Sequence, residues 1–172
     1  MAFDTYMIIG DGKVIPGEAT ADGLTPATGW MEIFSFSWGA SNPTTVGTAG
    51  KGLSAGKVSV SSFNIMKRTD DASPKLFGAC CGGTHFDTAS VTLRKATGVD
   101  GGQLEFLRYD FNDVMIESVQ WSGSAGGDDV PTESVSIAFG KVTIQNYIQD
   151  TTKGGLKKGT SAIWDLTKAA AK

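Results

Sequence analysis

The chain has 172 residues and a mass of 18.0 kDa, which predicts one domain that buries roughly 70% of its unfolded surface. The formal net charge of −3, with Lys and Arg scattered along the chain, argues against nucleic acid as a partner. Its 23 glycines are nearly twice the typical ~7% share, which favours many strands and tight connections over a helical bundle.

The N-terminus predicts synthesis in the cytoplasm without a signal peptide. It has no basic flank, and its apolar run at 6–9 is too short for a signal-peptide core. No run approaches the ~20 apolar residues of a membrane span, so membrane insertion is not expected. The adjacent Cys80 and Cys81 are poorly placed to bridge each other, which argues against a disulfide framework.

After an opening strand at 4–9, two strands at 29–43 and 54–63 are expected to alternate apolar residues with serines. Successive side chains of a strand point to opposite faces, so each strand would offer one face to a core and one row of hydroxyls. That row is unusual, because solvated strand faces more often carry Thr, Lys, Glu or Arg. The apolar residues are Phe34, Phe36, Trp38, Val58 and Val60, and the serines are Ser35, Ser37, Ser59 and Ser61.

The connection from 40 to 56 is too long and too open for a simple hairpin turn. Two interpretations remain open from composition. It is either a floppy surface loop or a segment that becomes ordered by docking on another subunit.

One helix is expected after Ser73, which would be its N-cap, with Pro74 at the first helical position. The pair at 82–83 would end it, because glycine readily adopts the left-handed conformation at a helix C-terminus. Its apolar side would comprise Leu76, Phe77 and Cys80.

Further strands are expected downstream, at 90–95, 103–112, 114–121 and 134–144. In the last of these, Ser134 and Ser136 repeat the hydroxyl row, and the apolar phase changes at Gly140. A phase change inside a strand indicates a bulge or bend, so a curved sheet is expected.

The composition changes after residue 149, which suggests a strand-rich domain at 1–149 and a C-terminal arm at 150–172. The arm is either a solvated extension with a helical end at 166–172 or a segment that docks through Ile163, Trp164 and Leu166. Burying a tryptophan contributes roughly 2 to 3 kcal/mol, so docking on the domain or on a neighbour is the favoured interpretation.

No catalytic, cofactor or metal site is predicted. Cys80, Cys81 and His85 are three soft ligands without the fourth that a structural zinc site needs. They are better interpreted as a core cysteine in a packed helix and a helix-end histidine. The chain shows neither a serine-triad motif nor a phosphate-binding loop, and Asp128 and Asp129 are interpreted as polar loop residues.

Four segments together resemble one family, the haemolysin co-regulated protein (Hcp) family of the bacterial type VI secretion system. They are FSFSWGASNP at 34–43, the stretch from SAGKVSVSSF to GACCGGTH at 54–85, VTLRKATG at 91–98 and GGDDVPTESVSIAFGKV at 126–142. The Trp-Asp-Leu at 164–166 also resembles the family's ending, with Ile163 where glycine is usual.

The resemblance implies an all-β fold: a two-sheet β-barrel or sandwich with one short flanking α-helix and a long extended loop. It also implies six copies in a ring and rings stacked into a hollow tube. The implied partners are further copies of the chain, a contractile sheath, spike proteins at the tip and small effector proteins. The tube would be exported to the extracellular space or into a target cell.

The resemblance further implies two sets of functional residues. The hydroxyl row would line the tube lumen and contact effectors, and Ser37 matches the family's lumenal serine between two aromatics. The extended loop would reach a neighbouring ring or subunit. The lumenal set is Ser35, Ser37, Ser59, Ser61, Ser134 and Ser136, and the loop set is Thr44, Thr45, Val46, Gly47, Thr48, Ala49, Gly50, Lys51, Gly52 and Leu53.

Two other functions compete with the tube. A monomeric β-sandwich that binds carbohydrate or protein ligands would usually expose aromatic side chains, whereas those of this chain fall on strand phases assigned to the core. A phage tail-tube-like protein would share the architecture and differ in its partners. The aromatics concerned are Phe34, Phe36, Trp38, Phe106 and Phe139.

Overall fold

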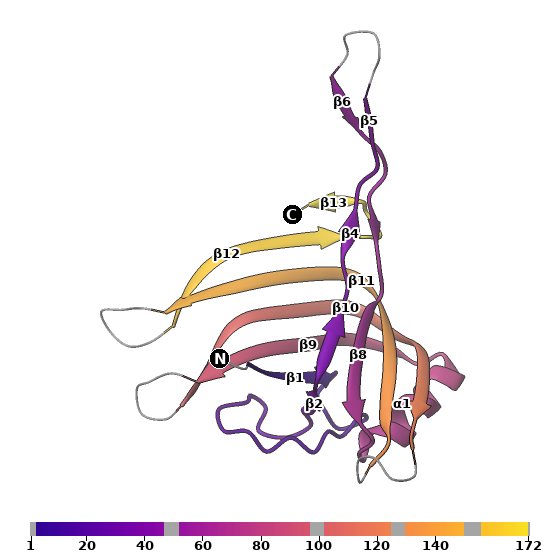
Figure 1. Cartoon of the computed structure of the whole chain (residues 1–172), viewed down its shortest axis with the longest axis vertical. Coiled ribbons are helices and arrows are strands. Elements are labelled where there is room, and N and C mark those ends of the chain that lie inside the picture. Colours follow the sequence, from indigo (N-terminus) through magenta and orange to yellow (C-terminus); the bar gives the residue numbers. More distant parts are fainter. Residues whose placement is uncertain (1–2, 47–51, 97–101, 125–129, 150–155, 172) are drawn as a thin grey trace.

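The fold is given by a computed structural model that describes residues 3–46, 52–96, 102–124, 130–149 and 156–171 (Figure 1). These residues form one helix, α1, and thirteen strands, most of them in one antiparallel sheet. The strands are β1 (Asp4–Ile9), β2 (Met31–Ile33), β3 (Ser35–Ser37), β4 (Ala40–Ser41), β5 (Thr44–Val46), β6 (Leu53–Ala55), β7 (Ser59–Val60), β8 (Phe63–Arg68), β9 (His85–Ala96), β10 (Gln103–Ser122), β11 (Thr132–Gln149), β12 (Leu156–Asp165) and β13 (Ala170–Ala171), and the helix is α1 (Ala72–Gly82).

The main sheet curls into a nearly closed barrel. Strand β1 pairs with β9, β9 with β10, β10 with β11, and the first half of β11 with β8. The short strands β2 and β3 follow each other along the chain and complete the circuit, because β2 pairs with β1 and β3 pairs with β8. The expected all-β barrel with one short helix is therefore confirmed for the described residues.

Aromatic side chains fill the inside of the barrel. Phe63 and Phe111 are buried with their ring centroids 5.0 Å apart, and Trp38 contacts both rings from the base of the 40–56 segment. The expected core position of Phe34 is wrong. The residue is 51% exposed and its ring lies beneath the Arg68 guanidinium, because the chain passes from β2 to β3 here.

The predicted bend at Gly140 is where β11 changes neighbours. Residues 132–137 pair with β8, whereas residues 141–149 pair with β12. Beside it, Asp113 has a φ of 55° and lies close to Gly140, where an added Cβ would stand 3.0 Å from the Asp113 Cβ. The two strands predicted at 103–112 and 114–121 are therefore the single curved strand β10 (Figure 1).

The C-terminal segment is a strand of the main sheet. Strand β12 pairs with β11 from Lys141↔Asp165 to Gln149↔Leu156, and Trp164 and Leu166 pack against the core. A helical end at 166–172 is wrong, because a turn at 166–169 and the short strand β13 follow β12. The described part of the chain has no helix that is long and apolar enough to cross a membrane.

Helix α1 begins at Ala72, and its N-cap is Asp71, two residues before the predicted N-cap. Ser73 lies within its first turn, and the carboxylate of Asp70 accepts a hydrogen bond from the Ala72 amide at 3.0 Å. The predicted end is confirmed, since Gly83 has a φ of 62° and its amide bonds back into the helix. Of the predicted apolar side, Leu76 is buried, whereas Phe77 is exposed beside Trp121.

The carboxylate of Asp165 organises the turn after β12. Its Oδ1 accepts hydrogen bonds from Thr167 Oγ1 at 2.6 Å, Thr167 N at 3.1 Å and Lys168 N at 3.2 Å. The Thr167 hydroxyl is the largest of the causes that lower the pKa of Asp165 from its ordinary 3.8. A carboxylate with a lowered folded-state pKa stabilises fully above its unfolded pKa, and the contribution is lost as pH falls through the folded one.

We therefore expect the turn at 166–169 to loosen at acid pH before the barrel unfolds. In an NMR titration, the amide signals of Thr167 and Lys168 should leave their native positions below pH 3.8, the ordinary pKa of this carboxyl. In Asp165→Asn the same amides should be displaced at neutral pH and show no acid step. Native amide signals that persist until global acid unfolding would contradict this role of Asp165.

Candidate functional site

Four of the predicted serines lie together on one face of the sheet. Ser35 is paired with Met66 and Met66 with Ser134, while Ser37 is paired with Asn64 and Asn64 with Ser136. Paired residues of antiparallel strands point to the same side, so both rows lie opposite the core residues Phe36, Ile65 and Val135. Strand β10 extends both rows. We call the set Ser35, Ser37, Asn64, Met66, Ser118, Gln120, Ser134 and Ser136 the serine face.

The eight side chains of the serine face carry no formal charge, and the exposed Arg68 lies in the next row of the same side of β8. Ser136 Oγ donates to Asn64 Oδ1 at 2.5 Å, and the Asn64 amide donates to the carbonyl oxygens of Ser62 and Ser37. Ser35 and Ser37 are exposed, and Met66 is the face's exposed apolar residue. The face can thus form hydrogen bonds over a broad surface without strong electrostatic attraction.

The other two predicted serines lie elsewhere. Ser59 belongs to β7 and is paired with Ser41 of β4, and Ser61 Oγ accepts a hydrogen bond from the Gly39 amide at 2.9 Å. Both are in the stem of the projecting segment. The regular alternation from 58 to 63 is interrupted, because β7 ends at Val60 and β8 begins at Phe63. Sequence reasoning therefore grouped them with the wrong surface and missed Asn64, Met66, Ser118 and Gln120.

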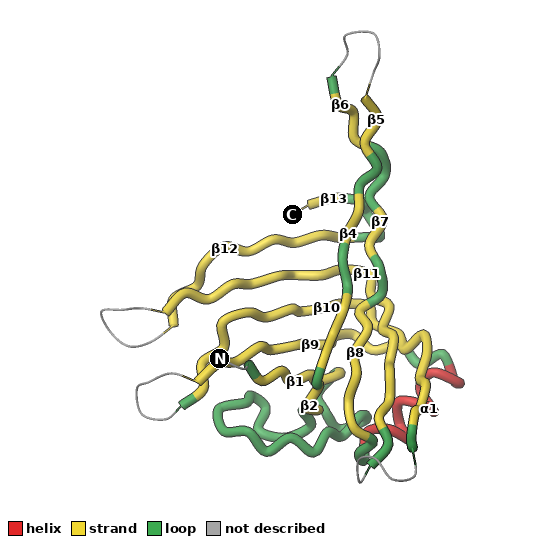
Figure 2. The backbone as a smooth tube through the Cα atoms, in the orientation of Figure 1, coloured by secondary structure: helices red, strands yellow, loops and turns green. Residues whose placement is uncertain are grey.

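The described residues of the 40–60 segment form a two-stranded arm that projects from the barrel (Figure 2). Its stem is the pair β4–β7, and farther out β5 pairs with β6, with Val46 opposite Leu53. These two side chains are 72% and 74% exposed. Of the predicted loop set, Thr44, Thr45, Val46, Gly52 and Leu53 are described, and residues 47–51 lie outside the described residues.

An arm of this kind needs a partner. A two-stranded hairpin is at best marginally stable in water on its own, and its strand edges leave backbone groups unpaired. Every described residue of β5 and β6 is exposed, including two large apolar side chains. This combination favours an arm that is buried in an assembly.

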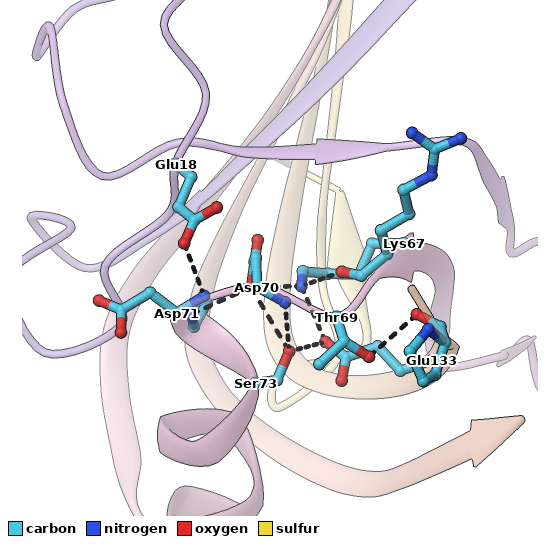
Figure 3. A network of polar contacts seen from close by, with 10 residues as sticks. Glu18, Lys67, Thr69, Asp70, Asp71, Ser73 and Glu133 are labelled. Carbon is cyan, nitrogen blue, oxygen red and sulfur yellow. Dashed lines mark hydrogen bonds and ion pairs between the residues drawn. The ribbon is translucent and has the colours of Figure 1, made fainter. Parts of the chain in front are cut away.

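A buried charge network fixes the sheet behind the serine face to α1 (Figure 3). Lys67 is fully buried, and its Nζ donates to Glu133 Oε1 at 2.8 Å and to Asp70 Oδ1 at 2.6 Å. Ser73, in the first turn of α1, also donates to Glu133 Oε1 at 2.8 Å. Sequence reasoning missed this network, although Lys67 continues the buried alternation of Phe63 and Ile65.

The cysteines and the histidine form no recognisable chemical site. Cys80 is partly buried with its thiol donating to the Glu117 carbonyl oxygen, and Cys81 and His85 are exposed. Among the described residues, no three His, Cys, Asp or Glu side chains are grouped so that they could hold a metal ion.

Comparisons with known proteins identify relatives of this fold. The family model described as "Type VI secretion system effector, Hcp" matches residues 6–146. Protein hcp1 of Pseudomonas aeruginosa is 38% identical over 88 residues, which are 51% of this chain and 52% of that protein. The match to this curated relative therefore spans about half of its length.

Two solved structures are similar over nearly the whole chain. One, described as a type six secretion system protein, has a TM-score of 0.86 and 33% identity, with 99% of this chain and 100% of that chain covered. The other, Hcp1 from Salmonella typhimurium, has a TM-score of 0.73 and 28% identity, with all of both chains covered. The family match, which takes in well over half of the sequence and most of the barrel strands, shows that this chain belongs to the Hcp family of the type VI secretion system.

Proposed function

We propose that the protein is the repeating subunit of a type VI secretion tube. Six copies close into a ring, rings stack into a hollow conduit, and a contractile sheath expels the tube with its spike proteins. Small effectors travel in the lumen. The observation that carries the proposal is the serine face, a broad uncharged surface across four strands in a member of the Hcp family.

The serine face suits the wall of a conduit. Hydroxyl and amide side chains keep a surface hydrated, and without ion pairs a passing cargo meets no strong local binding site. In this arrangement Ser35, Ser37, Ser134 and Ser136 face the lumen. The arm would meet a neighbouring ring or subunit, which would bury its exposed apolar pair.

The proposed function is tested by the native mass of the protein in dilute solution, with negative-stain images of the same sample. Sixfold rings with a central hole are the expected result. A monomer that persists at high concentration would contradict the tube and favour a solitary binding module.

Enlarging the serine face is expected to reduce effector loading. In Ser37→Gln, the longer side chain would project from an exposed position of β3, so the ring should form normally while a co-purified small effector falls about tenfold, equivalent to about 1.4 kcal/mol. Ser59→Gln is the matched control, because Ser59 lies in the arm stem and should leave loading unchanged. Loss of the ring in Ser37→Gln, or equal loading by the two variants, would contradict a lumenal Ser37.

A further inference from the structure

A cavity of about 280 Å³ lies where the loop between β1 and β2 meets strands β9 and β10. Leu24 and Trp30 of the loop line it on one side, and both are buried against Tyr6 and Ile8 in a small second core. Its polar wall comprises Thr92, Arg94, Gln103, Glu105 and Arg108.

Arg94 is the unusual member of this wall. The residue is only 6% exposed, and its Nη2 donates to the Gln103 carbonyl oxygen at 3.0 Å. Its Nη1 is buried and has no hydrogen-bond partner, and among the described residues no carboxylate forms an ion pair with it. A buried guanidinium nitrogen without a hydrogen-bond partner is costly, so an anionic oxygen placed at Nη1 would stabilise the folded protein.

The neighbouring carboxylates are already engaged by other groups. Glu105 lies across the strand pair from Arg94, but its Oε2 accepts from Thr92 Oγ1 at 2.5 Å and lies 3.6 Å from Arg108. Asp4 is the neighbour on β1, and its carboxylate accepts from Gln103 Nε2. The cavity thus contains the buried Arg94 guanidinium, and the neighbouring carboxylates of Glu105 and Asp4 are hydrogen-bonded to other side chains.

Gln103 provides a second buried polar atom without a hydrogen-bond partner. Because its Nε2 donates to Asp4, the amide orientation is determined, and Oε1 is left as a buried acceptor without a partner. A ligand that satisfies this wall must bring anionic oxygens for Arg94 and a hydrogen-bond donor for Gln103.

We propose that this cavity binds a carboxylate that carries a hydroxyl or amino group beside it, with the carboxylate at Arg94 and the donor at Gln103 Oε1. The volume, just below the ~300 Å³ at which drug-sized pockets begin, suits a group of this size. The carboxylate comes either from a free small acid or from a second copy of this chain. The inference is independent of the proposed tube.

Thermal unfolding of the full chain in glycolate, acetate and chloride at equal ionic strength tests the site. Glycolate carries the carboxylate and the adjacent hydroxyl, so it should raise Tm saturably by about 2–6 °C, with acetate giving less and chloride nothing. Arg94→Gln should abolish both shifts without lowering the Tm of the ligand-free protein. Lys13→Gln, which removes an exposed cation, should retain both shifts.

A second variant and a dilution series complete the test. Gln103→Met should retain the acetate shift and lose the additional effect of glycolate, which keeps the test decisive if Arg94→Gln does not fold. If a second copy supplies the carboxylate, the rise of Tm with protein concentration should be smaller in glycolate and in Arg94→Gln than in the ligand-free wild type, whereas a rise caused by ring assembly is the same in all three. The proposal is overturned if glycolate does not raise Tm and neither glycolate nor Arg94→Gln weakens the dependence of Tm on protein concentration, or if Arg94→Gln responds like the wild type.

Discussion

Lys67→Ala is expected to lower the free energy of unfolding by about 3–5 kcal/mol, the range for removing one partner of a buried ion pair. Lys67 and Glu133 are fully buried, and the Lys67 ammonium is bonded to both Glu133 and Asp70. Its removal leaves two carboxylates near each other with no cation, and Glu133 Oε2 already lacks a partner. Chemical denaturation monitored by circular dichroism measures the loss.

Two further variants separate charge from packing. Lys57→Ala, at an exposed lysine, should change stability by less than about 0.5 kcal/mol. The double variant Lys67→Met with Glu133→Leu should recover most of the loss, because apolar replacements of a buried pair are often neutral or stabilising. A loss below about 1 kcal/mol in Lys67→Ala, or a double variant no more stable than it, would contradict an unpaired-charge penalty.

The network also determines how α1 is placed. Asp70 accepts from the Ala72 amide at the helix start, while Ser73 donates to the buried Glu133. These contacts join the end of β8, the beginning of β11 and the first turn of the helix. If the loss of stability comes only from unpaired charge, the NMR amide signals of the first turn of α1 should keep their native positions in the double variant. In Lys67→Ala the same signals should be displaced.

Alternation was enough to predict strands within β1, β9, β10 and β11 and half of the serine face, but not β8 or β12. Ser35 and Ser37 follow the period of two, and the phase change at Gly140 marks the place where β11 passes from β8 to β12. The sequence could not show which residues pair across strands. Asn64, Ser118 and Gln120 belong to the serine face only because of the register of those pairs. Alternation also could not show that β7 ends at Val60, which separates Ser59 and Ser61 from the serine face.

Buried charges were missed for a different reason. A lysine within a polar stretch is normally solvated, and only the tertiary partners of Lys67 make its burial tolerable. The predicted start of the helix was wrong for the same reason. The Ser73 hydroxyl donates to Glu133, and the carboxylate that accepts from the Ala72 amide is that of Asp70. The alternative of a helical end at 166–172 is wrong because Asp165 organises a turn at 166–169 and the alanines beyond it pair with β12, which outweighs their local helical preference.

Charging the tip of the arm is expected to prevent rings from stacking while leaving ring closure intact, provided that the protein forms the proposed tube. Val46 and Leu53 are paired on one face of the β5–β6 ladder and are exposed in the single chain. Burying each of two such side chains contributes about 1.5–3 kcal/mol, so the double variant Val46→Lys with Leu53→Lys should lower the stacking equilibrium constant at least a hundredfold. Shortening the arm between Thr44 and Leu53 should have the same effect.

The matched control places the same two charges on the opposite face of the ladder. Thr45 and Ser54 are the neighbouring pair, so Thr45→Lys with Ser54→Lys changes net charge equally without touching the apolar pair. Tube length under crowded conditions, measured by electron microscopy, reports stacking, and sedimentation at low concentration reports the ring. Tubes of unchanged length in the Val46 and Leu53 variant would refute a docking role for the arm, and equal shortening in the control would attribute the effect to charge alone.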